Sequence, residues 1–266
     1  MMWAFLCCLL FFSCCLPEAK IPRKASILSI GISYEGTDAQ KLEGTINDAT
    51  ELHAAFSQRY PQATALLLCD RMATKAHVQA ALSSMTGQEL LIISYSGHGT
   101  QNGSWVLCDP EGTQFEDGKV KEANLLSPED LWALLSPYPG PVLVISDSCY
   151  SGNLLPASAA ISSANDKDGD LSLGMVEERR YALSCTTRDN TGKEDRNAHR
   201  HGYFTRALLD ELGWDHEQST LSGQDQAISL DSLYEGVLRR QRIALDGNPR
   251  TSQRPVVSPG PWELWL

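Results

Sequence analysis

Short runs of mostly apolar residues recur along the chain, and each ends in a polar or glycine-containing turn. The runs cover residues 25–32, 65–69, 90–94, 142–145 and 181–185, with a smaller one at 105–108. Their apolar character is continuous rather than alternating, which favours strands buried on both faces. The pattern therefore predicts a buried, mainly parallel sheet.

Segments between these runs have apolar residues at the spacing of an amphipathic helix. Residues 47–60 place four of them on one side, namely Ala49, Leu52, Phe56 and Tyr60. Asp48 would lie in the first turn of this helix, where the helix dipole favours a carboxylate. Taken alone, Asp48 would be interpreted as an ordinary residue of a helix N-terminus.

Capping residues mark where further helices begin and end. Thr74, Ser127 and Ser229 can each cap a helix with one apolar side, and a proline and two acids follow Ser127, as suits a first turn. Gly213 ends a helix predicted over residues 202–212. Because strands alternate with helices along the chain, we expect an α/β fold with a mainly parallel sheet.

Two stretches lack any helical or strand period. Residues 154–179 are rich in Ala, Ser, Asn, Asp and Gly and are predicted to form an exposed, mobile loop. Within it, residues 165–170 mimic part of a calcium loop, but the flanking helices and the final acid at the required spacing are missing, so we interpret them as a solvated linker. Residues 186–201 are predicted to form a loop on the substrate side.

The first 19 residues are interpreted as a leader, followed by a polar linker over residues 20–24. Residues 3–16 are apolar and uncharged, too short for an ordinary membrane-spanning helix, and typical of a signal-peptide core, although no Lys or Arg precedes them. A weak lipoprotein-type cleavage box leaves a lipid anchor on Cys14 or Cys15 as an alternative. We expect an exported protein, whether periplasmic, secreted or lipid-anchored. A misassigned start codon, which would leave the protein cytoplasmic, stays open.

Two of the apolar runs end in residues that can carry out chemistry. Residues 90–96 lead into His98, which stands between two glycines, and residues 142–147 lead into Cys149. Parallel strands present their carboxyl ends at one edge of the sheet, so the imidazole and the thiol are expected in one cleft. A neighbouring imidazolium lowers a thiol pKa and can protonate a leaving amine. Either residue alone would be interpreted as structural: an inert buried thiol and a loop histidine.

Composition narrows the choice of partners. The chain has 266 residues, of which 42% are hydrophobic, enough for one large domain with a full core. A formal net charge of −11 argues against a nucleic-acid partner, which needs clustered Lys and Arg.

Four of the eight cysteines lie in the leader and four in the body. With one body thiol as nucleophile, three remain, which disfavours a disulfide framework but leaves one pair possible.

Three sequence blocks together resemble the caspase-like cysteine peptidases (clan CD, peptidase C14), and the metacaspase branch in particular. They are residues 95–99 (YSGHG), residues 147–152 (DSCYSG), and an opening block over residues 32–49. The histidine precedes the cysteine by 51 residues, compared with about 50 in caspases. The likeness runs from about residue 25 to about residue 255.

The resemblance implies a fold and a division of the chain. The fold would be a caspase-like three-layer α/β sandwich, with a mainly parallel sheet of about six strands and helices on both faces. One peptidase domain would cover residues 25–266, with a large-subunit-like part to about residue 153, a mobile linker over residues 154–179, and a small-subunit-like part over residues 180–266. Residues 253–257 resemble the closing strand of the family.

The resemblance also implies roles for individual residues. His98 and Cys149 would form the catalytic dyad of a cysteine endopeptidase that works through a thioester acyl-enzyme. The backbone amides of Gly99 and Cys149 would form the oxyanion hole. Asp48, Ser96 and Asp147 would line the S1 pocket, which in metacaspases binds Arg or Lys. We therefore predict protein or peptide substrates with a basic P1 residue, and a chain that acts as a monomer.

Two further expectations concern processing and calcium. An enzyme that cuts after basic residues could cleave itself after Lys167, Arg179 or Arg180.

No cofactor is required for the chemistry. Many metacaspases bind activating calcium through acids after the catalytic histidine, and the weak candidates here are Asp109, Glu116 and Asp117, which are better explained as surface acids. The chain also departs from the family at Thr45, which stands where many metacaspases carry a cysteine.

The other histidines receive the plainer interpretation. Two lie on predicted helices and three in polar segments, where we expect solvated side chains rather than metal ligands: His53, His77, His199, His201 and His216. Two rival functions fit the sequence less well. A catalytically silent binding module would not need both dyad residues, and a nucleotide-binding domain would need a glycine-rich phosphate loop that the first strand lacks.

Overall fold

The computed structural model describes residues 24–87, 89–155, 179–195, 200–245, 253, 255–257 and 264–266. The predicted leader, Lys167, the calcium-like segment at residues 165–170 and His199 lie outside these residues. None of the helices in the described part of the chain is long and apolar enough to span a membrane.

A six-stranded sheet forms the centre of the fold, with the strand order β14-β9-β8-β3-β1-β2. All neighbouring strands run parallel except β14, which is antiparallel to β9. The strands are β1 (Ala25–Gly31), β2 (Thr64–Cys69), β3 (Leu90–Ser96), β8 (Val142–Asp147), β9 (Arg180–Ser184) and β14 (Val256–Val257). The predicted mainly parallel sheet of about six strands is confirmed.

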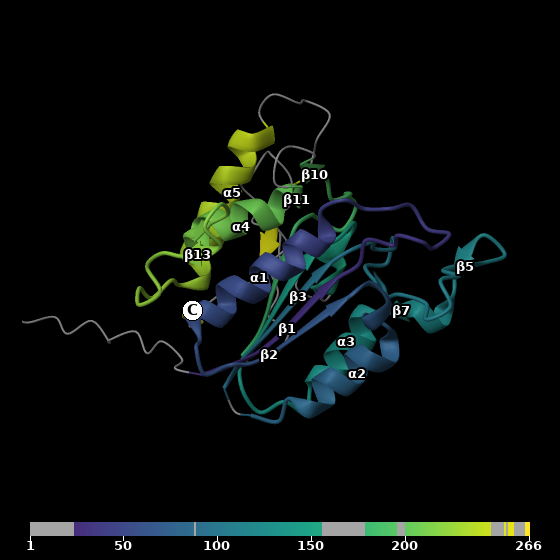
Figure 1. Ribbon diagram of the computed structural model, residues 1–266, viewed down its shortest axis with the longest axis horizontal. Coiled ribbons are helices and arrows are strands. Elements are labelled where there is room, and N and C mark those ends of the chain that lie inside the picture. The colour runs from purple at the N-terminus through teal and green to yellow at the C-terminus, as the bar shows by residue number, and fades with distance from the viewer. Residues whose placement is uncertain are drawn as a thin grey trace, which may run out of the picture.

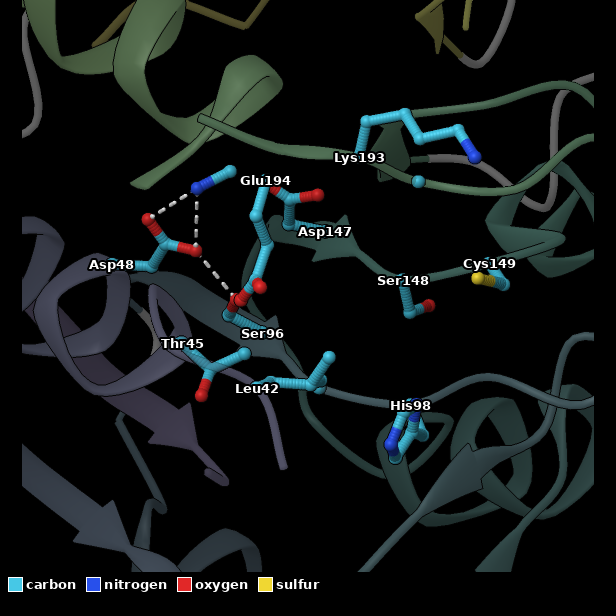
Figure 2. Close-up of a pocket in the computed structure, with 13 residues that line it drawn as sticks. Leu42, Thr45, Asp48, Ser96, His98, Asp147, Ser148, Cys149, Lys193 and Glu194 are labelled. Atoms are coloured by element: carbon cyan, nitrogen blue, oxygen red, sulfur yellow. Dashed lines mark hydrogen bonds between the residues drawn. The ribbon is translucent and has the colours of Figure 1, made fainter. Parts of the chain in front are cut away.

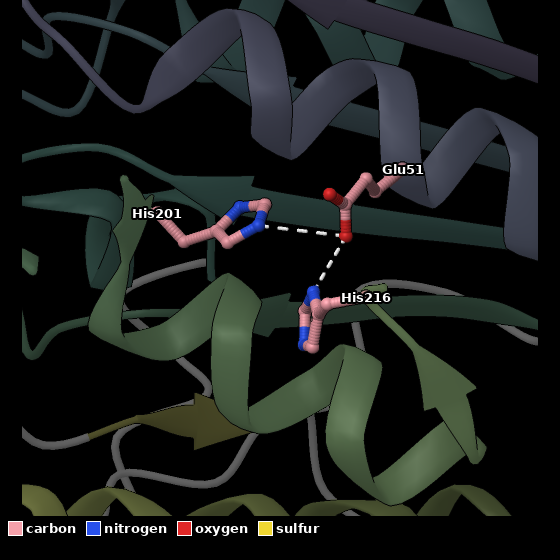
Figure 3. Close-up of side chains that lie close together, drawn as sticks. All are labelled: Glu51, His201 and His216. Carbon is pink, nitrogen blue, oxygen red and sulfur yellow. Dashed lines mark hydrogen bonds and ion pairs between the residues drawn. The ribbon is translucent and has the colours of Figure 1, made fainter. Parts of the chain in front are cut away.

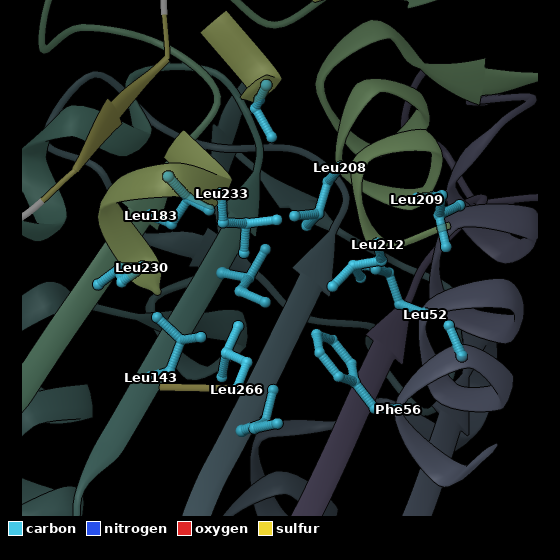
Figure 4. Packing of buried hydrophobic residues seen from close by; sticks show 14 of the residues in the cluster. Leu52, Phe56, Leu143, Leu183, Leu208, Leu209, Leu212, Leu230, Leu233 and Leu266 are labelled. Carbon is cyan, nitrogen blue, oxygen red and sulfur yellow. The ribbon is translucent and has the colours of Figure 1, made fainter. Parts of the chain in front are cut away.

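Five α-helices cover the two faces of this sheet (Figure 1). On one face lie α1 (Thr45–Arg59), α4 (Tyr203–Leu212) and α5 (Leu230–Leu245), and on the other lie α2 (Lys75–Ser84) and α3 (Pro128–Leu135). Alternate residues of each strand enter separate apolar clusters, so that Ile92 of β3 packs with α1, α4 and α5 while Ile93 packs with α2 and α3. Figure 4 shows the first cluster, in which leucines of α4 and α5 meet Phe56 of α1 above the strands.

The capping residues behave as the sequence predicts. Thr74 accepts a hydrogen bond from the His77 amide, and Ser127 accepts one from the Asp130 amide. Gly213 ends α4 in the left-handed region at φ 87°, which a residue with a Cβ adopts only at a cost. Local sequence therefore sets these helix ends.

Short elements complete the chain. Four two-stranded ribbons pair β4 (Trp105–Val106) with β7 (Leu125–Leu126), β5 (Phe115–Glu116) with β6 (Lys119–Val120), β10 (Glu194–Asp195) with β11 (His201–Gly202), and β12 (Trp214–Asp215) with β13 (Thr220–Leu221). The short 3₁₀ helices in the described part of the chain are η1 (Asp70–Met72), η2 (Glu122–Asn124) and η3 (Ser151–Leu154). The strand predicted at 105–108 is only two residues long, because the Leu107 and Cys108 amides donate to the Asn124 and Ala73 carbonyls, which lie outside β7.

Strand order decides where the polar ends of the strands meet. β3 and β8 are neighbours, and the last paired residues are Ser96 and Asp147. Helix α1 starts beside the end of β1, where a Cβ on Gly31 would lie 2.5 Å from the Thr45 carbonyl oxygen. Because Gly31 has no side chain, α1 can approach closely enough to bring Asp48 to the same edge of the sheet.

Candidate active site

A pocket opens at the carboxyl edge of the sheet (Figure 2). It is lined by residues from four parts of the chain: Leu42, Thr45, Asp48, Ser96, Gly97, His98, Asp147, Ser148, Cys149, Gly192, Lys193, Glu194 and Gly202. The structure thus brings together the histidine, the cysteine and all three expected S1 residues. The loop predicted on the substrate side, residues 186–201, contributes Gly192, Lys193 and Glu194.

His98 is held by three groups that the sequence did not reveal. Its Nε2 atom lies 2.7 Å from the backbone carbonyl oxygen of Gln40. Because a carbonyl can only accept, Nε2 carries the proton and Nδ1 is left to exchange one. The His98 amide donates to the Tyr34 hydroxyl at 2.9 Å, and the Tyr95 hydroxyl donates to the His98 carbonyl at 2.7 Å. The two tyrosines therefore fix the peptide that carries the imidazole.

Gly99 lies directly against the nucleophile segment, since a Cβ there would collide with the Cys149 carbonyl oxygen. Gly99 also pairs with Trp105 in an antiparallel bridge whose hydrogen bonds are made by the flanking residues. In such a pair the residue's own N–H points away from the partner strand. The Gly99 amide is thereby available to an oxygen atom placed near Cys149.

Cys149 follows β8 at a sharp change of direction. The next residue, Tyr150, has φ 56°, and its amide donates to the Asn190 carbonyl at 2.7 Å. Burial raises the pKa of the Cys149 thiol, the nearby Asp147 raises it further, and the Gly192 amide opposes the rise. The half-buried thiol therefore needs a further positive charge nearby to ionise readily.

Asp48 is buried at the start of α1, and its carboxylate is held from several sides. Oδ2 accepts from the Ser96 hydroxyl at 2.6 Å, and Oδ1 accepts from the Gly202 amide at 3.1 Å. Oδ1 also lies 2.8 Å from Nδ1 of His201. Asp48 is therefore more than a helix-terminal acid: it joins β3 to the beginning of α4.

Asp147 is the second buried carboxylate of the pocket. Its Oδ2 accepts hydrogen bonds from the Thr205 amide at 3.1 Å and from the Thr205 hydroxyl at 2.7 Å, at the positive end of α4. Burial raises the pKa of Asp147 to about 7, and repulsion from Asp48 contributes to the rise. A Cβ on Gly202 would collide with the Asp147 carboxylate, so the glycine leaves room for that acid.

The interpretation of His201 as a solvated side chain is wrong. Its side chain is 0% exposed, and it lies between Asp48 and Glu51. Burial opposes its charge, but the hydrogen bonds to these two carboxylates prevail and raise the pKa of His201 to about 9. His216 is also buried rather than solvated, at 8% side-chain exposure, because it packs against Glu51. The His-Gly pair directly before α4 is the sequence signal that could have marked His201 as a site residue. Nothing in the sequence marks the roles of Tyr34 and the Gln40 carbonyl.

The structure does not gather the calcium candidates into a ligand group. Asp109 is held by Lys121 at 3.2 Å and by the Asn124 amide group at 3.3 Å. Glu116 and Asp117 lie on the exposed ribbon of β5 and β6. Within the described residues the three therefore remain separate surface or ion-paired acids.

The proposed self-cleavage positions differ in accessibility. Arg179 is exposed and directly precedes β9. Arg180 begins β9, pairs with Val142, and donates to the Gly140 carbonyl at 2.7 Å. A protease would have to pull Arg180 out of the sheet to cut after it.

The four cysteines in the described part of the chain are free thiols, namely Cys69, Cys108, Cys149 and Cys185.

Comparison with known proteins identifies the family. The model of the caspase domain family, Peptidase C14, matches residues 24–258. The chain is 30% identical to Metacaspase-4 of Arabidopsis thaliana over 156 residues, which cover 53% of this chain and 37% of that protein. It is 29% identical to Metacaspase-6 of the same plant over 157 residues, which cover 54% of this chain and 42% of the relative. The chain thus spans less than half the length of these relatives.

Solved structures show the same fold. Caspase-1 from Spodoptera frugiperda superposes with a TM-score of 0.54 at 15% identity, covering 90% of this chain and 86% of that one. A Geobacter sulfurreducens protein superposes with a TM-score of 0.54 at 20% identity, covering 90% and 94%. The predicted caspase-like sandwich is confirmed.

Proposed function

This chain belongs to the caspase-domain family of cysteine peptidases, and on that premise we propose that it is an endopeptidase that cleaves peptide bonds after Arg or Lys. The observation that carries the proposal is the pair of buried carboxylates, Asp48 and Asp147, in the pocket that also contains His98 and Cys149. Asp147 beside the thiol hinders its ionisation, and a cation bound between the two acids would relieve that effect. A substrate guanidinium or ammonium group supplies that cation, whereas an acidic side chain would be repelled.

The proposed reaction begins when the basic side chain enters between the two acids and brings the scissile carbonyl to Cys149. His98 takes the thiol proton, the resulting thiolate adds to the carbonyl carbon, and the oxyanion accepts hydrogen bonds from the Gly99 and Cys149 amides. His98 gives a proton to the leaving amine, and the C–N bond breaks, which leaves a thioester on the cysteine. Water then adds to the thioester, His98 takes its proton, and the thiol is restored as the acid product leaves.

The electrostatics of the pocket favour activation of the thiol by the substrate itself. Asp147 contributes to the raised pKa of Cys149 in the free protein. A bound guanidinium offsets that negative charge and so favours the thiolate. In this scheme a substrate without a cation would be bound weakly and would also meet a less reactive thiol.

The test compares fluorogenic peptides that differ only at P1, which is Arg, Lys, citrulline or Asp. Citrulline has the shape of Arg without its charge, so the Arg-to-citrulline ratio isolates the effect of the carboxylates. We expect Arg and Lys peptides to be cleaved at least about 100-fold faster than the other two, and no cleavage by the Cys149→Ala protein. Preference for Asp would refute the specificity. Failure of an Arg-based thiol-reactive probe to label Cys149 would favour a silent binding module.

We also propose self-cleavage after Arg179, whose side chain is exposed directly before β9; because the Arg179 carbonyl accepts a hydrogen bond from the Val142 amide at 3.0 Å, the cut requires this end of β9 to leave the sheet. Wild-type protein should release two fragments joined non-covalently, and the Cys149→Ala protein should stay intact. The Arg179→Gln protein should lose this cut while retaining peptide cleavage. Equal processing of the wild-type and Cys149→Ala proteins would contradict self-cleavage.

A further inference from the structure

Two histidines and a glutamate meet beside Asp48, outside the residues that line the pocket (Figure 3). They come from three separate elements: Glu51 from α1, His201 from β11, and His216 from the turn after β12. One side-chain ligand atom of each residue lies within 4.8 Å of the other two. The Glu51 Oε2 atom lies 3.4 Å from His201 Nε2 and 2.7 Å from His216 Nδ1.

We propose that Glu51, His201 and His216 form a binding site for a divalent cation of the zinc class. Two imidazoles and one carboxylate are the three-protein-ligand set that Zn²⁺ takes when a fourth position is left to water. Bonds of about 2.1 Å in tetrahedral geometry place ligand atoms roughly 3.4 Å apart. The 3.4 Å separation between Glu51 and His201 equals this value and the 2.7 Å separation between Glu51 and His216 is shorter, so side-chain adjustments suffice to admit the ion.

The second nitrogen of each histidine is already oriented for this role. His201 Nδ1 lies 2.8 Å from Asp48 Oδ1, and His216 Nε2 lies 3.1 Å from Asp210 Oδ1. A carboxylate that accepts the proton of one ring nitrogen leaves the other nitrogen as a metal ligand and increases its basicity. Both imidazoles therefore have the carboxylate partner that metal-binding histidines commonly use.

His201 supplies an independent reason to expect a ligand. Its side chain is fully buried, and its Nε2 atom meets Glu51 Oε2 at 3.4 Å, which is too long for a well-formed hydrogen bond. A buried polar nitrogen left in this state is costly. A cation bound between Nε2 and the Glu51 carboxylate would satisfy both groups.

The site is closed on one side and open on the other. The Glu51 side chain is 21% exposed and the His216 side chain 8%, whereas His201 is covered completely. A cation can therefore enter from the Glu51 side, where water could complete its coordination. The bound cation would connect α1 to the two ends of α4, because His201 precedes this helix and His216 follows it. The site exists whether or not the chain is a peptidase.

The test uses full-length Cys149→Ala protein, stripped of metal with a chelator, because the pocket thiol and His98 could themselves bind zinc. Equilibrium dialysis with Zn²⁺ should show a site that Glu51→Gln and His216→Gln each weaken at least about 10-fold. Asp210→Asn should weaken it less, since Asp210 only positions His216. The control is His77→Gln, which removes an exposed histidine from α2 on the other face of the sheet and should change nothing.

Two measurements, one spectroscopic and one by diffraction, locate the bound metal without relying on the variants. Co²⁺ bound at this site should give visible d–d bands without the near-ultraviolet charge-transfer band of a thiolate ligand, which separates it from the leader cysteines. Zinc-edge anomalous diffraction should place a peak between Glu51, His201 and His216. A peak elsewhere, no peak, or zinc affinity unchanged in folded Glu51→Gln and His216→Gln proteins would overturn the proposal.

Discussion

The Nδ1 atom of His201 lies 2.8 Å from the Oδ1 atom of Asp48, although 153 residues separate them in the chain. The histidine belongs to the part of the chain that resembles a small subunit, and the aspartate to the part that resembles a large one. Together with the Ser96 hydroxyl and the Gly202 amide, His201 fixes the carboxylate in one orientation. The pocket that we propose as S1 is therefore completed only when the two parts of the chain pack together.

Replacing His201 by glutamine should weaken both stability and substrate binding. The change removes a charged partner from buried Asp48, and we expect a loss of about 3 kcal/mol in the free energy of unfolding. The KM for Arg peptides should rise roughly 10-fold with a smaller change in kcat, because the carboxylate loses its orientation. Urea unfolding and steady-state kinetics measure the two effects, with His77→Gln as control. An unchanged KM would show that Asp48 does not depend on His201.

Asp147→Asn should stabilise the protein at neutral and alkaline pH. The pKa of Asp147 is about 7 in the folded chain and near 3.9 when unfolded, so the folded state binds the proton more tightly. The buried charge therefore reduces stability progressively from about pH 4 to pH 7. We expect the free energy of unfolding of the Asp147→Asn protein to exceed that of the wild type by about 2 kcal/mol at pH 8, as measured by urea unfolding. The difference should become smaller toward pH 5.

The matched control is Asp48→Asn, which should destabilise the protein by about 3 kcal/mol because it leaves the buried His201 without its nearest charge. Equal effects of the two substitutions would mean that the acids are equivalent in the fold.

The same Asp147→Asn protein should show opposite changes in two reactions. Cleavage of Arg peptides should fall at least about 100-fold, since one of two carboxylates for the guanidinium is lost. Alkylation of Cys149 by iodoacetamide at pH 7.5 should become a few-fold faster, because Asp147 contributes to the raised pKa of the thiol. A parallel fall in both rates would indicate a distorted site instead.

The pH dependence of kcat/KM for Arg peptides should report Asp147. Above pH 7 the carboxylate is charged and can bind the guanidinium, and below pH 7 it takes up a proton. We therefore expect kcat/KM to fall about 10-fold per pH unit below 7, since this ratio reports groups of the free enzyme. Iodoacetamide alkylation monitors the thiol alone and should have its inflection at higher pH. Coincident profiles would assign the inflection to Cys149.

Tyr34→Phe should reduce the rate through His98. The change removes the acceptor for the His98 amide and the donor to the Val106 carbonyl, at a cost of about 1–3 kcal/mol in stability. With the histidine peptide less fixed, kcat should fall roughly 10-fold. Tyr138→Phe is the control, because its hydroxyl donates to the Glu89 carbonyl at the opposite end of β3 and β8. The Tyr138→Phe protein should be less stable than the wild type but should have the same kcat.

The order of the core elements and the pairing of the two reactive loops follow from the sequence alone. Apolar runs are sufficient to identify strands, and Thr74, Ser127 and Gly213 set helix ends through local hydrogen bonds and backbone angles. His98 and Cys149 could be placed at one edge because each directly follows a parallel strand. These features depend on residues close together in the chain, which a one-dimensional pattern can show.

The tertiary structure alone decided how that edge is held together. The burial of His201 and its contacts with Asp48 and Glu51 arise from α4 packing against α1. Its polar neighbours in the sequence predicted a solvated side chain instead. The support of His98 by the Gln40 carbonyl comes from a backbone atom, which every residue type carries, so no sequence motif could mark it. Contacts between distant segments depend on how the helices pack on the sheet, and for that reason they became visible only in three dimensions.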